Sequence, residues 1–212
     1  MHFSEKNLVD NFIQNHPNKT NLIVECDFRW GNIDVVEYES YSEVYLNVEQ
    51  VKILRNNKNL NVFSCLYRNR GLRAETISLK SGLDINVVKL ILRKLILNSI
   101  VVINGYTYSI NSKINFPDIK VYAYEMKLMD IRKAINQAVI NQSFCDYSYI
   151  VFPQSKSKLC QKYYDLLIDN GVGLILVNGD NNNIIIRAKK VNTHKSSILS
   201  SKIKLIESRI CN

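Results

Sequence analysis

The chain lacks the residue patterns on which several common kinds of site depend. Its five cysteines stand singly, with no C-x-x-C pair, so neither a zinc site nor a dithiol redox centre is indicated. Only three histidines occur, His2, His16 and His194, and they lie towards the two ends of the chain. This placement argues against a histidine metal cluster or a histidine-based triad. Any chemistry here must therefore use carboxylates and lysine.

Phosphate-binding loops and nucleophile motifs are also missing. The sequence contains no Walker loop, no G-x-G-x-x-G and no G-x-S-x-G elbow, which leaves nucleotide hydrolysis, hydride transfer and serine esterase chemistry without support. No apolar run has the length needed to span a bilayer. The N-terminal segment is amphipathic and charged, unlike a signal peptide. We therefore expect a cytoplasmic protein with no membrane partner.

Acidic residues are scarce relative to basic ones. The 212 residues include 28 Lys and Arg against 19 Asp and Glu, a formal net charge of +9. This excess favours a polyanionic partner such as nucleic acid, although the charge alone also fits a merely basic protein. With 46% apolar residues, the chain is globular and large enough for one elaborate domain or two small ones.

The middle of the chain has the pattern of a small DNA-binding module. Helices are predicted over 74–79 and 85–97 with a turn at 81–84, followed by strands at 100–103 and 106–110 around an Asn-Gly turn. This order resembles a winged helix-turn-helix, a module that serves either as a DNA reader or as a protein scaffold. We expect DNA contacts from Arg68, Arg70, Arg73, Asn86, Lys89, Arg93 and Lys94.

Strands and helices alternate outside this module, which predicts an α/β fold. A helix near the N-terminus precedes two short strands within 21–39. After Pro117, strands are predicted at 120–128, 147–153, 172–178 and 183–190, with helices at 130–143 and 157–171. We divide the chain into residues 1–39, an insertion at 40–116, residues 117–191 and a basic helical tail at 192–212.

Two acids and a lysine lie within apolar segments that are predicted to be strands. Asp34 lies in "GNIDVVEY", and Glu125 and Lys127 lie in "KVYAYEMKL". Residues two apart on a strand share a face, so Glu125 and Lys127 should project together. A solvated ion pair would explain them, and a turn-adjacent acid would explain Asp34. Two carboxylates with a lysine are also the minimal set for metal-assisted phosphodiester hydrolysis.

These segments, followed by a helix that contains Gln137, resemble the PD-(D/E)XK nuclease superfamily. The resemblance implies a restriction-endonuclease-like mixed sheet flanked by helices. It implies that Asp34 and Glu125 bind Mg²⁺ or Mn²⁺, that Lys127 orients or activates water, and that Gln137 supports the site. Glu5 matches more weakly the extra acid of some members. Two departures are the absence of a proline just before Asp34 and the long insertion between Asp34 and Glu125.

The function that follows from the resemblance is Mg²⁺-dependent DNA endonuclease activity, with the winged helix docking on duplex DNA. The resemblance suggests that such an endonuclease would act in defence, restriction or repair. The alternative is a DNA-binding transcriptional regulator whose nuclease-like core is catalytically silent and serves for sensing or as a homodimer interface. A nuclease directed at RNA remains a third hypothesis, because charge does not separate RNA from DNA.

Overall fold

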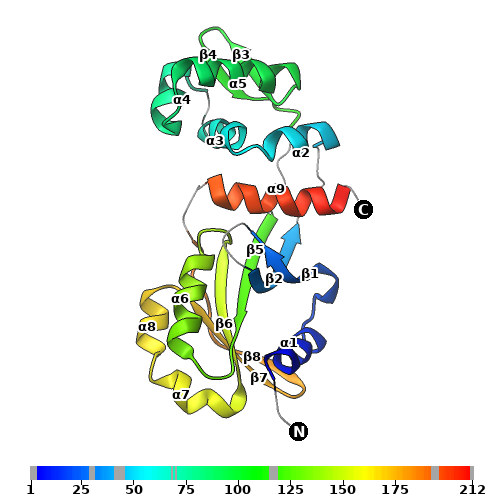
Figure 1. The fold of residues 1–212 in the computed structure, drawn as a ribbon, viewed down its shortest axis with the longest axis vertical. Coiled ribbons are helices and arrows are strands. Elements are labelled where there is room, and N and C mark those ends of the chain that lie inside the picture. The colour runs from blue at the N-terminus through cyan, green and yellow to red at the C-terminus, as the bar shows by residue number, and fades with distance from the viewer. Residues whose placement is uncertain are drawn as a thin grey trace. The chain divides into compact units, whose positions relative to one another are not determined.

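The computed structural model describes residues 4–28, 32–40, 46–67, 69, 71–114, 119–191 and 196–210. The chain forms two compact units, each built from segments that are far apart in the sequence (Figure 1). Unit 1 comprises residues 1–39 and 119–193, and unit 2 comprises residues 40–118 and 194–212. The C-terminal segment that we set apart as a tail therefore clusters with unit 2 from residue 194 onwards.

Unit 1 contains a six-stranded mixed sheet with the strand order β1-β2-β5-β6-β7-β8. The pairs β5–β6 and β6–β7 are parallel, whereas β1–β2 and β7–β8 are antiparallel. The expected α/β class and the mixed sheet flanked by helices are confirmed. In chain order the strands are β1 Leu22–Asp27, β2 Asn32–Ser40, β5 Ile119–Met126, β6 Tyr147–Pro153, β7 Gly173–Asn178 and β8 Asn181–Ile186.

Helix α1 (Glu5–Gln14) covers one face of this sheet. The Ser4 side chain caps its first turn by accepting a hydrogen bond from the Asn7 amide. The buried Leu8 and Phe12 of α1 pack on alternate residues of four strands, because every second side chain on a strand faces the same way. Those strand residues are Val35, Tyr124, Met126, Tyr149, Val151, Ile175 and Val177.

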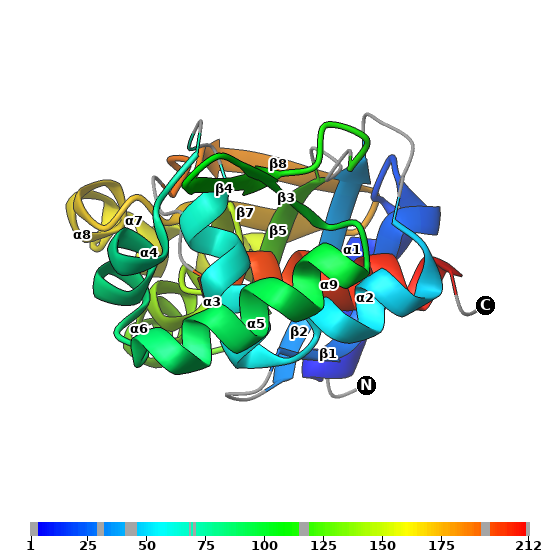
Figure 2. The same ribbon diagram turned by 90° about the horizontal axis from the view of Figure 1, so that it is seen from above.

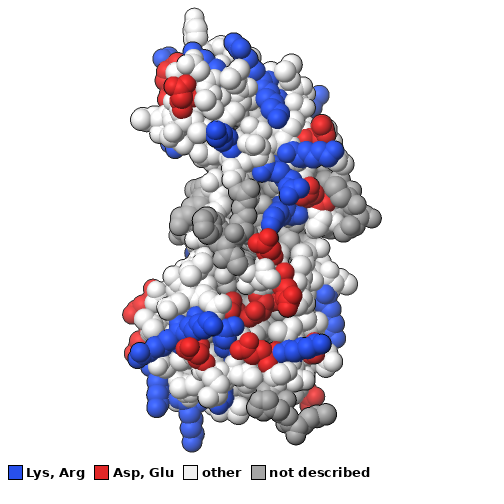
Figure 3. All heavy atoms as spheres, in the orientation of Figure 1, with Lys and Arg blue, Asp and Glu red and all other residues white. Residues whose placement is uncertain are grey.

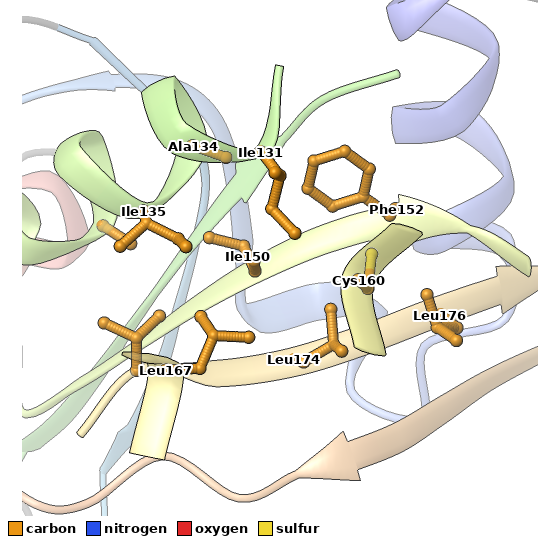
Figure 4. Packing of buried hydrophobic residues seen from close by; sticks show 11 residues of the cluster. Ile131, Ala134, Ile135, Ile150, Phe152, Cys160, Leu167, Leu174 and Leu176 are labelled. Atoms are coloured by element: carbon orange, nitrogen blue, oxygen red, sulfur yellow. The ribbon is translucent and has the colours of Figure 1, made fainter. Parts of the chain in front are cut away.

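Three helices cover the opposite face (Figure 1): α6 (Ile131–Asn141), α7 (Ser157–Gln161) and α8 (Tyr164–Asp169). Figure 4 shows Ile131 and Ile135 of α6 in one cluster with Ile150 and Phe152 of β6. Strand β6 is therefore buried on both sides, as expected for a strand in the parallel part of a sheet. Short 3-10 turns, Lys19–Asn21 and Gln154–Lys156, precede β1 and α7.

Unit 2 is mainly helical, with a two-stranded sheet (β3–β4) at one side (Figure 2). Helix α9 packs on α2 and α3, and α3 in turn contacts α4 and α5. Its elements are α2 Val48–Leu54, α3 Asn57–Leu66, α4 Ala74–Ser81, α5 Ile85–Leu97, β3 Val101–Asn104, β4 Thr107–Ile110 and α9 Ser196–Ile210.

The turn between α4 and α5 uses a glycine that the backbone requires. Gly82 ends α4 with φ 67°, in the left-handed region, and the Asp84 side chain then caps α5 by accepting from the Asn86 amide. Four apolar residues on one face of α5 are buried: Val88, Ile91, Leu92 and Leu95. Across the described segments of both units, no helix combines the length and the apolar character needed to cross a membrane.

Candidate active site

Adjacent strands of unit 1 bring Asp34 and the end of β5 together. The Met126 amide donates a hydrogen bond to Asp34 Oδ2 at 2.7 Å. Further along the same two strands, the Tyr124 hydroxyl donates to Glu37. These contacts run in opposite directions along β2 and β5, as in an antiparallel pair. Asp34, close to the beginning of β2, therefore lies next to Glu125 and Lys127 despite the long insertion between them.

Lys127 is the centre of a cluster of charges. Its Nζ lies 2.9 Å from Glu125 Oε1, 3.7 Å from Asp34 Oδ2 and 4.0 Å from Glu5 Oε2. The ammonium also donates to the Met126 carbonyl at 2.9 Å. The structure thus brings together four of the residues that the sequence singled out. Glu125 and Lys127 project to the same side, as their spacing predicted.

Burial sets the electrostatics of this cluster. Glu125 is 1% exposed, whereas the Lys127 side chain is 12% exposed. Burial, and then the charge of Asp34, raise the pKa of Glu125 in spite of the opposing effects of Lys127 and Asn141. Burial also acts to lower the pKa of Lys127, but Glu125, Asp34 and Glu5 outweigh it and the net pKa is raised. One firmly charged ammonium therefore faces three carboxyl groups.

Asn141, on α6, is a site residue that the sequence did not reveal. Its Nδ2 donates to Glu125 Oε2 at 3.4 Å, and the residue is buried. Asn141 shares a helix face with the buried Ala134 and Ala138, so a polar residue in the apolar stripe of 130–143 was the available signal.

Gln137 lies one turn before Asn141 on the same helix. Its Oε1 is buried and has no hydrogen-bond partner among the described residues. No hydrogen bond between Gln137 and the carboxyl groups of the site is present in that part of the chain. Asn141, rather than Gln137, is the polar contact that α6 makes with Glu125.

The carboxyl groups fit a divalent cation. Glu125 Oε1 is buried and has no partner by strict hydrogen-bond geometry in the described structure, but it is ion-paired with the Lys127 ammonium 2.9 Å away. Mg²⁺ commonly uses one or two carboxylates and keeps several waters. The described residues contain no cluster of three or more His, Cys, Asp or Glu arranged to hold a metal. A cation here would use Asp34 and Glu125, with waters or substrate oxygens as its other ligands.

Asp34 also opens into a cavity of about 400 Å³ between α1 and β1. Two further acids that the sequence did not single out, Asp10 and Glu25, line it together with Glu5 and Lys6. Figure 3 shows acidic side chains gathered over β1 and β2 of unit 1. A phosphate would be repelled by such a lining unless a cation accompanied it.

Glu25 reaches this cavity from the point of β1 that faces Asp34. Val24 pairs with Val35 and Cys26 pairs with Ile33, so the register is unbroken and leaves Glu25 of β1 opposite Asp34 of β2. The φ of Glu25, 52°, is unusual for a residue with a side chain. The pairing of β1 with β2 therefore places a second acid across from Asp34.

The candidate DNA-contacting residues of unit 2 lie mostly on α5. Asn86, Lys89, Arg93 and Lys94 are exposed on this helix. Arg73, at the start of α4, is exposed and joins Lys89 in lining a cavity of about 600 Å³ beside the β3–β4 turn. Figure 3 shows basic side chains spread over the face of unit 2 that is in view. Arg68 and Arg70 lie outside the described residues.

Comparison with protein-family models, with curated proteins and with solved structures gives no significant match for this chain. What the site can do therefore follows from its own geometry and chemistry.

Removing the Lys127 ammonium should destabilise the protein, because the buried carboxylate of Glu125 would lose its counter-charge. We expect Lys127→Met to lower the free energy of unfolding by roughly 3 kcal/mol near neutral pH, because Glu125 loses its cation. Without that cation the pKa of Glu125 rises further, so the loss should shrink as pH falls towards 4.5, the ordinary glutamate value. Denaturant unfolding in the presence of a chelator measures both effects.

The matched control is Lys127→Met combined with Glu125→Gln, which removes the uncompensated charge. This double variant should recover part of the lost stability. A loss that is independent of pH, or one that the second substitution increases, would contradict the claim that Lys127 stabilises an ionised, buried Glu125.

Proposed function

We propose that the chain is a metal-dependent deoxyribonuclease of the PD-(D/E)XK type. The observation that carries the proposal is the meeting of Asp34, Glu125 and Lys127 at the adjacent ends of β2 and β5, with Nζ 3.7 Å from Asp34 and 2.9 Å from Glu125. The order of elements supports it too. An antiparallel pair β1–β2 lies beside β5, and α6 connects β5 to the parallel strand β6.

Each residue of the site has a separate part in the proposed reaction. Asp34 and Glu125 would hold Mg²⁺ or Mn²⁺, which when bound offsets phosphate charge and supplies an acidified water. Lys127 is suited to bind a phosphate oxygen and to orient the attacking water. Asn141 positions Glu125 through the hydrogen bond to Oε2. Glu5, whose side chain is 55% exposed, is placed to hold solvent at the mouth of the site.

Unit 2 would supply the affinity for DNA. Exposed cations on α5 and at the start of α4 suit contacts with backbone phosphates, and the β3–β4 turn with the exposed Tyr106 would act as the wing. The same surface would also serve a regulator that binds DNA without cutting it. The buried Glu125–Lys127 pair would then only stabilise the sheet. The two hypotheses differ in one observable, which is cleavage.

Cleavage should require the carboxylates and a divalent cation. Supercoiled plasmid, linear duplex, single-stranded DNA and RNA are incubated with Mg²⁺, with Mn²⁺ or with a chelator. We expect DNA cleavage by the wild type, a loss of roughly 100-fold or more in Asp34→Asn and Glu125→Gln, and about tenfold in Asn141→Ala. Lys158→Gln, a change at an exposed residue of α7, is the control and should cut normally.

Each variant is first checked for normal unfolding, so that lost activity is not lost structure. If no form cuts any substrate while all of them retard DNA in a gel, the regulator is favoured. Preferential cleavage of RNA would support the third hypothesis.

DNA affinity should depend on individual cations of α5. Lys89→Ala and Arg93→Ala are each expected to weaken binding at all sequences and to reduce the slope of log affinity against log salt by about 1. Fluorescence anisotropy of a labelled duplex at several salt concentrations measures this. Lys58→Ala removes an exposed lysine of α3 and should leave the slope unchanged. Equal slopes for all four proteins would exclude α5 from the DNA interface.

A further inference from the structure

A second and larger cavity of unit 1 lies where its three parallel strands end. The cavity measures about 670 Å³. Leu128 and Met129 follow β5, residues 153–156 lie at the end of β6, residues 177–179 end β7, and Asn11 comes from α1. In open α/β sheets, ligands bind in the crevice outside the carboxyl ends of the strands. The cavity therefore occupies the usual place for a ligand of this fold class.

Hydrogen bonds hold the walls of this cavity in place. The Asn15 side chain donates to the Gly179 carbonyl at 2.7 Å, and the Asn182 side chain donates to the Phe12 carbonyl at 2.8 Å. Both bonds tie α1 to the β7–β8 hairpin. Within the lining, Lys156 Nζ lies 3.3 Å from Met129 Sδ. These contacts support the walls from within the protein.

The lining residues suit a ligand that has a flat, uncharged part and one anionic group. The apolar members of the lining are Leu128, Met129, Pro153 and Val177, and its amide side chains are Asn11, Gln154 and Asn178. Lys156 is the one charged residue of the lining, within the described chain, and no acid is present there. A nucleotide has this make-up, since its base combines apolar faces with polar edges and its phosphate is an anion. The volume lies in the range of small-molecule sites.

The position of the cavity relates it to the candidate active site. Leu128 and Met129 are the first and second residues after Lys127, so their Cα atoms lie within about 8 Å of that of Lys127. Asp34 and Glu125 stand at the same edge of the sheet. A nucleotide next to a phosphate held at Lys127 is therefore within reach of the cavity. Its base enters only when unstacked and unpaired.

We propose that this cavity receives one unstacked nucleotide of the strand that is cut at Asp34, Glu125 and Lys127. The preferred substrate is then single-stranded DNA or a duplex with an unpaired nucleotide. The identity of the strand rests on the proposed nuclease function, but nucleotide binding is measurable without cleavage.

Calorimetric titration of the full chain with dAMP and with inorganic phosphate tests the binding step. We expect dAMP to bind more tightly than phosphate. Ser155→Trp, which fills the cavity from an exposed position, should weaken dAMP binding at least about tenfold, and Lys156→Gln should weaken it about threefold to tenfold. Lys158→Gln is the matched control, because Lys158 lies two residues away and outside the lining, and it should leave the affinity unchanged.

Cleavage of a fully paired duplex, of the same duplex with one unpaired nucleotide, and of the single strand tests the substrate preference. The unpaired nucleotide should raise the cleavage rate about tenfold or more, and Ser155→Trp should abolish this advantage while leaving slow cutting of the paired duplex.

The outcomes separate the two proposals. If dAMP binds no better than phosphate, if Ser155→Trp binds it equally well, or if paired and unpaired substrates are cut alike, the cavity is not a nucleotide site and the nuclease proposal is unaffected. If dAMP binding depends on Ser155 and Lys156 but no DNA is cut, the cavity binds nucleotides and only the nuclease proposal fails.

Discussion

The ion pair between Glu125 and Lys127 is the contact on which the candidate site depends. A carboxylate that is 1% exposed is costly unless a cation accompanies it, and Lys127 Nζ at 2.9 Å is that cation. Carboxylate oxygens of Asp34 and Glu5 also lie within 4 Å of this ammonium. One lysine thus holds acids from α1, β2 and β5 in one place. Because three acids share one cation, the site retains an excess of negative charge that a metal would balance.

Helices on both faces of the sheet give this charge cluster its position. The α1 face and the α6 face each bury alternate residues of the same strands, so the strands cannot slip without exposing apolar side chains. That constraint fixes Asp34 beside Met126, and it turns Glu125 towards Asn141 of α6. The alternation of buried residues along the strands therefore determines both the packing of the sheet and the geometry of the site.

The sequence predicted the parts of this structure that depend on local periodicity. The strand predicted at 120–128 and found at 119–126, the helix predicted and found at 85–97, and the shared side of Glu125 and Lys127 all follow from spacings of two or of three to four residues. Residues brought in by the tertiary fold were not predictable in the same way. Glu25 reaches the cavity only because β1 pairs with β2 in the register that sets it opposite Asp34, and Asp10 only because α1 crosses that face. The packing of α9 on α2 and α3 joins the two ends of unit 2, which no local pattern encodes.

The most direct test of the account is whether the carboxyl groups around Lys127 bind a divalent cation. Electron paramagnetic resonance of Mn²⁺ titrated into the wild type and into the Asp34→Asn/Glu125→Gln double variant measures this without any DNA. The account predicts Mn²⁺ bound by the wild type and a loss of at least about tenfold in affinity in the double variant. Equal binding by the two proteins, or no binding by either, would contradict it.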